Sequence, residues 1–169
     1  MRLFFALWPD DTVRAELGAI AVSIAARAEG RSVPAANLHL TLCFLGDIAD
    51  ERAAEAIEAA NAVRGAGFDL ALDTLGSFRG ARVAWAGLSR VPAALVVLQS
   101  SLEGELRARG FMLEDRPFSA HATLARRIAK GIAREAMAPI AWKVSQFVLV
   151  RSETGRGSYT VLKRWNLEG

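Results

Sequence analysis

The chain contains only two histidines, and both begin the same four-residue string, His-x-Thr-Leu. The first string starts at His39 and the second at His121, 82 positions later. Chance repetition of this string around both histidines of a 169-residue chain is improbable, so we interpret both as functional residues. The repeat constrains the fold, because it favours an arrangement in which two distant segments present the same side chains to one site.

Each string lies in a short apolar run that predicts a β-strand. Side chains at positions i and i+2 of a strand share a face and lie about 6.5–7 Å apart. Thr41 is therefore expected to point the same way as His39, and Thr123 the same way as His121. The opposite face of the first strand is expected to form a continuous core stripe of Leu38, Leu40, Leu42 and Phe44.

Helical and strand-like segments alternate along the chain, and no linker, charge run or low-complexity stretch divides it. Asp10 or Asp11 is a suitable N-cap for the first helix, Gly30 a suitable end for it, and Pro92 a suitable start for the third. The pattern predicts helices over 10–29, 50–63 and 92–109, and strands over 2–8, 38–45, 68–75, 83–88, 121–126, 142–151 and 159–167.

The composition is that of a globular protein, with 52% hydrophobic and 23% charged residues. A net charge of +3 permits a phosphate substrate but is too small for a dedicated duplex-binding domain. The single cysteine, Cys43, excludes an internal disulfide and any multi-cysteine metal site. The first apolar run stops at Pro9, too early for a signal peptide, and no run is long enough to span a membrane. We therefore expect a cytoplasmic protein without membrane contact.

The residue types favour metal-free acid–base chemistry. Two histidines without a third ligand at metal spacing do not make a zinc site, and no phosphate-cradling glycine-rich loop is present. No nucleophile motif accompanies the histidines, and Cys43 has no base assigned to it. Two imidazoles with pKa values near 6.5 can instead divide the roles of acid and base across a phosphorus atom, while threonine hydroxyls bind its oxygens. We expect neither a metal nor a cofactor.

The two strings and their flanks resemble the two-histidine (2H) phosphoesterases, in particular the LigT-like RNA 2′,3′-cyclic phosphodiesterases, also called the 2′–5′ RNA ligase family. The resemblance extends over nearly the whole chain and is carried by residues 2–6, 37–46, 83–87, 116–126 and 159–165. It implies one domain over residues 1–169 with an α+β fold. Two pseudo-symmetric lobes would each carry an antiparallel sheet along a central cleft, with helices packed outside.

The resemblance also implies an activity, the hydrolysis of RNA 2′,3′-cyclic phosphate ends to 2′-phosphomonoesters without a metal. His39 would protonate the departing 3′-oxygen and His121 would activate water, although the two strings are chemically equivalent. The implied partners are RNA 3′ ends, those of tRNA fragments included, or small cyclic nucleotides, and we expect a monomer. Alternative readings are a phosphodiesterase acting on 2′–5′ oligoadenylate or an ADP-ribose cyclic phosphate, a reversible 2′–5′ RNA ligase, and a non-enzymatic RNA-end binding module.

Cationic and aromatic residues supply the remaining candidates for substrate binding. Arg126 follows the second string directly and is expected to stabilise phosphate charge. Phe5 and Tyr159 are the leading candidates for stacking on a terminal base. Further aromatic candidates are Phe44, Trp85 and Phe118, and further basic ones are Arg116, Arg127, Lys130, Arg134, Arg151, Arg156, Lys163 and Arg164.

Overall fold

The computed structural model describes residues 1–153 and 155–169, and within them it contains three α-helices and nine strands. The helices are α1 (Asp11–Arg27), α2 (Ala53–Asn61) and α3 (Ala93–Ala108). The strands are β1 (Arg2–Leu7), β2 (Arg31–Ser32), β3 (Leu40–Asp47), β4 (Phe68–Phe78), β5 (Val83–Gly87), β6 (His121–Arg126), β7 (Glu135–Val144), β8 (Gln146–Glu153) and β9 (Ser158–Asn166).

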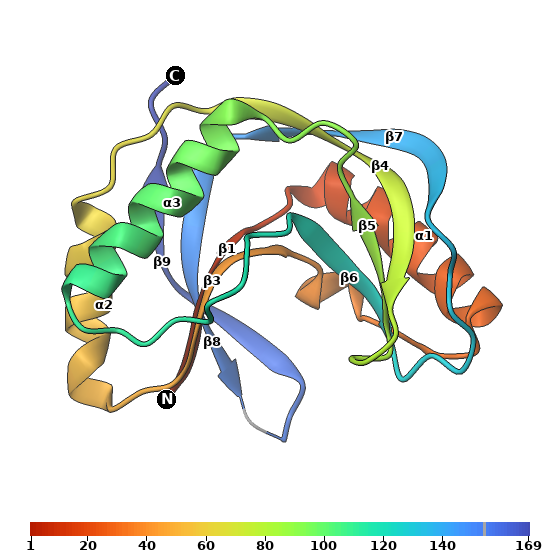
Figure 1. Ribbon diagram of the computed structural model, residues 1–169, viewed down its shortest axis with the longest axis horizontal. Helices are drawn as coiled ribbons and strands as arrows, with labels where there is room; N and C mark the ends of the chain where they lie inside the picture. Colours follow the sequence, from red (N-terminus) through yellow and green to blue (C-terminus); the bar gives the residue numbers. More distant parts are fainter. Residues whose placement is uncertain (154) are drawn as a thin grey trace.

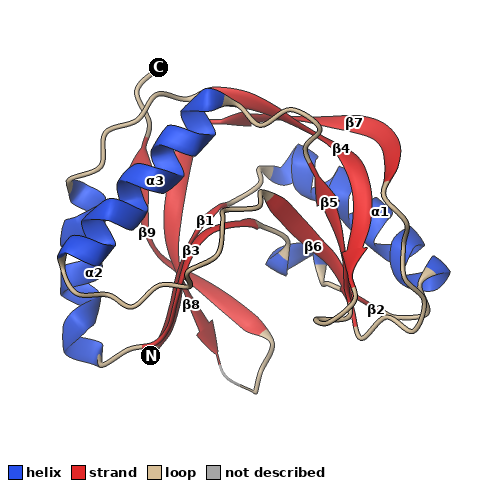
Figure 2. Ribbon diagram, viewed as in Figure 1, coloured by secondary structure: helices blue, strands red, loops and turns tan. Residues whose placement is uncertain are grey.

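These strands form one antiparallel sheet in the order β7-β4-β5-β6-β3-β1-β8-β9, with β2 added on β6. A single pair, Leu40 and Ala122, joins β3 to β6 and so divides the sheet into two halves. One half contains β7, β4, β5, β6 and β2, and the other contains β3, β1, β8 and β9. Helices α2 and α3 lie outside the half that contains β3, and α1 lies outside the half that contains β6 (Figures 1 and 2). The predicted α+β class is confirmed, and the two expected sheets are two halves of one hydrogen-bonded sheet.

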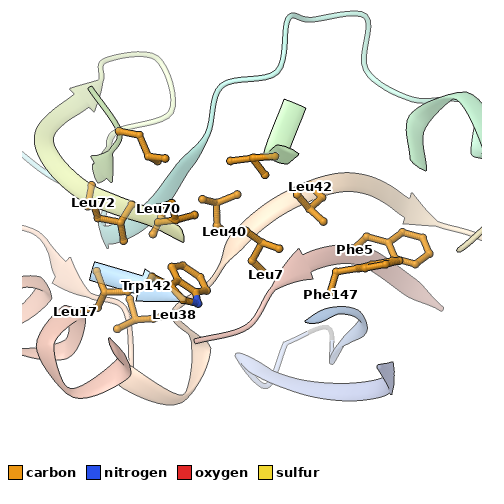
Figure 3. Packing of buried hydrophobic residues seen from close by; sticks show 14 of the residues in the cluster. Phe5, Leu7, Leu17, Leu38, Leu40, Leu42, Leu70, Leu72, Trp142 and Phe147 are labelled. Atoms are coloured by element: carbon orange, nitrogen blue, oxygen red, sulfur yellow. The ribbon is translucent and has the colours of Figure 1, made fainter. Parts of the chain in front are cut away.

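The core runs continuously through both halves. Leu38, Leu40 and Leu42 are buried as the alternation predicts, and Figure 3 shows them in a cluster with Leu17 and Leu72 at one end and Phe5 and Phe147 at the other. The first helix begins as expected, because the Asp10 carboxylate accepts a hydrogen bond from the Val13 amide at 2.9 Å. Because these leucines are buried, the side chains on the opposite face of the strand are the ones available to form the site.

The predicted strand 142–151 is wrong in one respect, because the structure divides it at Ser145 into two consecutive strands that lie in different halves of the sheet. β7 pairs with β4 in one half of the sheet, whereas β8 pairs with β1 in the other. The first part of β7 escaped prediction because it is rich in alanine and contains Pro139, both unfavourable for a strand. Proline is tolerated there because β7 is an edge strand with an irregular register beside Leu72.

The expected position of Phe44 in the core stripe is also wrong. Opposite β1, the register steps from Thr41 directly to Cys43, so Leu42 is an extra residue in a bulge. The bulge reverses the alternation, and Phe44 is left 38% exposed on the same face as Thr41. β6 has the corresponding bulge, because its register against β5 steps from Thr123 to Ala125 and leaves Leu124 extra. The leucine of each His-x-Thr-Leu string is thus a bulge residue.

Trp85 lies flat on the sheet because two glycines leave room for its ring. It pairs with Gly76 on β4 and Thr123 on β6. A Cβ atom built on Gly76 would lie 2.3 Å from Trp85 Cζ2, and one built on Gly87 would lie 2.9 Å from Cζ3. The glycines therefore position this ring beside the second His-x-Thr-Leu string.

We expect Gly76→Ala to lower the free energy of unfolding by about 2 kcal/mol, because the added methyl group overlaps the Trp85 ring. Urea unfolding followed by circular dichroism measures this change. The matched control is Gly104→Ala in the interior of α3, where an added Cβ meets nothing within 4 Å. That variant should be stabilised by about 0.5–1 kcal/mol. Equal midpoints for Gly76→Ala and the wild type would contradict the packing described here.

Candidate active site

The pairing of Leu40 with Ala122 brings the two His-x-Thr-Leu strings together. In an antiparallel pair the neighbours of paired residues also face one another, so His39 lies across from Thr123 and Thr41 lies across from His121. The flanking residues alternate away from the buried Leu40 and Ala122 and thus share the opposite face. The structure therefore places the four predicted residues side by side, around a local two-fold axis.

Both imidazoles are held in the same way. His39 Nδ1 donates to the Asn37 carbonyl oxygen at 2.7 Å, and His121 Nδ1 donates to the Ser119 carbonyl oxygen at 2.7 Å. A carbonyl can only accept, so each ring keeps its proton on Nδ1 when neutral and presents an unprotonated Nε2. His39 Nε2 accepts a hydrogen bond from the Thr41 hydroxyl at 3.0 Å. Each ring can therefore take a proton on Nε2 or, once protonated, give one up there.

Three aromatic rings surround His39. Phe4 stacks on the imidazole at 4.7 Å between ring centroids, Trp8 stacks at 5.8 Å, and Tyr159 meets it edge-on at 5.4 Å. Burial lowers the pKa of His39 to about 4, reinforced by the charges of Arg126, His121 and Arg14 and opposed by the bond to Asn37.

His121 is more open. Phe78 on β4 meets its ring edge-on at 5.2 Å, and Phe78 in turn packs on Trp85 at 5.5 Å. Burial lowers the pKa of His121 as well, and the charge of Arg116 adds to the decrease while the bond to Ser119 opposes it. The expectation of two pKa values near 6.5 is therefore wrong for the unliganded protein, because both rings lose hydration on folding.

Arg126 shares the site face because of the bulge at Leu124. It pairs with Val83, which alternates with Trp85, and Trp85 pairs with Thr123. Without the extra residue, the Arg126 side chain would lie on the opposite face of the sheet. It is exposed in the structure, and its charge contributes to the lowered pKa of His39.

Arg14 was not singled out by sequence reasoning, yet it supports the segment that carries His39. Its guanidinium donates to the carbonyl oxygens of Pro9, Ala35 and Leu38, the last at 3.3 Å. It also lies 5.2 Å from the centre of the Trp8 ring, which stacks on His39. No motif marks it, because its partners are backbone atoms that only the fold brings together.

A cavity of about 580 Å³ opens beside the second string. One wall is formed by β3 from Thr41 to Phe44, and another by the segment from Leu113 to Ser119 that precedes His121. Four of the predicted site residues also line the cavity, namely Thr41, His121, Thr123 and Arg126. Gln99 and Glu103 of α3 also line the cavity, and neither was identified from the sequence.

The prediction that Phe5 contacts the substrate is wrong. Phe5 is fully buried in the core, where it packs against Phe147 and Trp165. Neighbouring residues of a strand face opposite ways, so only one of Phe4 and Phe5 can face the site, and the register of β1 selects Phe4. Tyr159 does lie beside His39, as do Phe4 and Trp8, which sequence reasoning did not identify.

The other candidates fall into two groups. Phe44 and Phe118 line the cavity, and Arg116 lies at the same wall, where it pairs with Glu114. Lys130 and Arg151 lie outside the cavity lining and form ion pairs with Glu29 at 3.7 Å and Glu153 at 2.7 Å.

Over 1–153 and 155–169, no group of three or more His, Cys, Asp or Glu side chains is arranged to hold a metal ion. Within the same residues, no helix combines the length and apolar character needed to cross a bilayer.

Comparisons with known proteins agree with this geometry. The Escherichia coli protein named RNA 2′,3′-cyclic phosphodiesterase is 34% identical over 172 residues, which cover 98% of this chain and 96% of that protein. The protein of the same name from Thermus thermophilus is 33% identical over 184 residues, covering 100% and 91%.

Solved structures of Escherichia coli LigT share the fold. The apo form superposes with a TM-score of 0.87 at 33% identity, covering 99% of this chain and 98% of that one. The complex with 3′-AMP gives a TM-score of 0.85 at 34% identity, covering 98% and 97%.

A family description, LigT-like phosphoesterase, matches residues 7–85, which include the first string. The second string lies in the part of the chain that the full-length relatives also cover. The chain therefore belongs to the LigT-like phosphoesterase family.

Proposed function

We propose that this protein hydrolyses 2′,3′-cyclic phosphates at RNA 3′ ends, or on nucleosides, to 2′-phosphomonoesters by acid–base catalysis with His39 and His121. The observation that carries the proposal is the antiparallel pairing at Leu40 and Ala122, because it faces two imidazole–hydroxyl pairs toward one another. An in-line displacement at phosphorus needs a base on the entering side and an acid on the leaving side. The family's relatives, named for this reaction, support the assignment.

The reaction uses each Nε2 once. His121 Nε2 takes a proton from water as the water oxygen forms a bond to phosphorus. The bond from phosphorus to O3′ breaks, and protonated His39 gives its Nε2 proton to O3′. Thr41, Thr123 and Arg126 bind the remaining phosphate oxygens, whose charge grows in the transition state. Exchange of protons with solvent then restores protonated His39 and neutral His121.

The cavity supports a nucleoside as the group attached to the phosphate. Its volume of about 580 Å³ lies within the usual range for small-molecule sites, and Phe44 and Phe118 provide apolar walls. We infer that the protein acts in the cytoplasm as a monomer on RNA ends, those of tRNA fragments included, and needs no cofactor. Size-exclusion chromatography with light scattering tests the monomer.

His39→Ala and His121→Ala should each lower turnover of a 2′,3′-cyclic nucleotide by about 10²-fold or more, because each loses one proton-transfer group. Initial rates measured by chromatography of the 2′-phosphate product check this expectation. Wild-type turnover should persist in EDTA, since both proton transfers use imidazole. Activity that disappears with EDTA and returns with a divalent cation would contradict the metal-free mechanism.

The control for these variants is folding, because His39 packs among three rings. Near-ultraviolet circular dichroism reports the packing of Trp8 and Tyr159 and should stay close to the wild-type spectrum in His121→Ala. A variant that keeps full activity would show that its histidine does not transfer a proton.

The lowered pKa values of both histidines predict an acidic optimum for kcat/KM. Turnover needs one ring protonated and one neutral, so kcat/KM should be highest between the two lowered pKa values, below pH 6.5. Above this range the protonated fraction, and with it kcat/KM, falls about tenfold per pH unit. In kcat the alkaline limb should lie at higher pH, because a bound phosphate anion raises the pKa of both imidazoles. Rate measurements from pH 4 to 9 separate the two profiles, and a kcat/KM optimum above pH 7 would contradict the prediction.

A further inference from the structure

The local two-fold symmetry of the site is broken, and only one side is open. Beyond the Leu40–Ala122 pair, Thr41–Phe44 and the segment before His121 diverge, and the cavity lies between them. The corresponding gap on the other side is closed by β2, since Ser32 pairs with Ala125 and the Val33 amide donates to the Leu124 carbonyl at 2.8 Å. The cavity is therefore open to a nucleoside bound through its phosphate beside the strings.

The cavity lining has opposite polar character on β6 and on α3. The β6 side, with His121 and Arg126, offers donors and positive charge, which suits a phosphate. The α3 side presents Gln99 and the carboxylate of Glu103. A negative charge repels phosphate, so a nucleotide has one favourable orientation, with its base toward α3.

The amide of Gln99 is fixed so that its oxygen remains available. The side chain is only 9% exposed, and its Nε2 donates to the Leu42 carbonyl at 3.3 Å and to Glu103 Oε2 at 3.4 Å. The reverse orientation would place the amide oxygen against two acceptors, which is unfavourable. Among the described residues, Gln99 Oε1 has no hydrogen-bond partner.

Glu103 is held in place in a similar way. Its Oε1 accepts two hydrogen bonds from Arg107, at 2.9 and 3.2 Å, which orient the carboxylate along α3. Its Oε2 accepts one bond from Gln99 and has further capacity, because a carboxylate oxygen can accept two. The α3 side of the cavity thus offers acceptors from both side chains.

We propose that Gln99 and Glu103 select the terminal nucleobase, favouring bases with an exocyclic amino group over uracil. This inference rests on the proposed function for the phosphate end of the site. An amino group of cytosine, adenine or guanine donates hydrogen bonds to these acceptors. Such an amino group has two N–H donors, one for each acceptor. Uracil offers only N3–H, and its neighbouring O4 carbonyl leaves the second acceptor without a donor, which is costly when that acceptor is desolvated.

Cytidine and uridine 2′,3′-cyclic monophosphates test the proposal, because they have nearly the same shape and differ at positions 3 and 4 of the ring. The wild type should turn over the cytidine compound with a kcat/KM about tenfold or more above that of the uridine compound, as expected for one discriminating base contact. Equal values would overturn the proposal while leaving the hydrolase assignment intact.

Glu103→Gln supplies a donor in place of an acceptor and should reduce the cytidine preference at least severalfold, chiefly by raising kcat/KM for uridine. Gln99→Met removes the other acceptor and should reduce the preference too. The matched control is Glu105→Gln, since Glu105 also pairs with an arginine four residues later, Arg109, yet does not line the cavity. It should leave the ratio unchanged. A ratio unaffected by Glu103→Gln and Gln99→Met would overturn the assignment of these residues.

A binding measurement separates this inference from the proposed reaction. Calorimetric titration with cytidine and uridine 2′-monophosphates does not depend on turnover. Tighter binding of the cytidine compound, weakened in Glu103→Gln, supports the proposal even if no cyclic phosphate is hydrolysed. Equal affinities, or no binding of either nucleotide, would refute it.

Discussion

The site depends on one backbone contact, the antiparallel pair between Leu40 and Ala122. This pair is the only register contact between β3 and β6 among the described residues, and it lies at the centre of the local two-fold axis. Because both side chains are buried, their neighbours are forced onto the opposite face. Two histidines and two threonines from distant segments thereby share one face of the sheet.

One bulge in β3 and one in β6 place different kinds of side chain beside the two His-x-Thr-Leu strings. The extra leucines, Leu42 and Leu124, turn the third residue after each threonine to the site face. On one strand this residue is Phe44 and on the other it is Arg126. The same backbone device thus provides an apolar surface beside one string and a positive charge beside the other. The two sides of the site therefore differ although the backbone around it is nearly symmetric, and β2, which closes the gap on one side, adds to this difference.

Much of the site was predictable because strand periodicity and the repeated string are local properties. Alternation correctly placed Thr41 with His39 and Leu40 in the core. It failed for Phe44, since a bulge leaves no mark in the residue pattern, and for Phe5, since the choice between adjacent phenylalanines depends on register. The lowered pKa values and the roles of Arg14 and Gln99 also escaped, because they arise from burial and from backbone partners far away in the chain.

The sequence by itself determined that two equivalent imidazole–hydroxyl pairs exist and that each lies on a strand. Both follow from the residue types and from the alternation of apolar and polar residues in each segment. Only the tertiary structure decided that the pairs face each other, which aromatic rings enclose His39, and which side of the site is open. Those outcomes depend on strand register and on the packing of helices over the sheet. Register and packing are both set by the burial of apolar side chains across the whole core. They therefore cannot be predicted from the residues of one short segment.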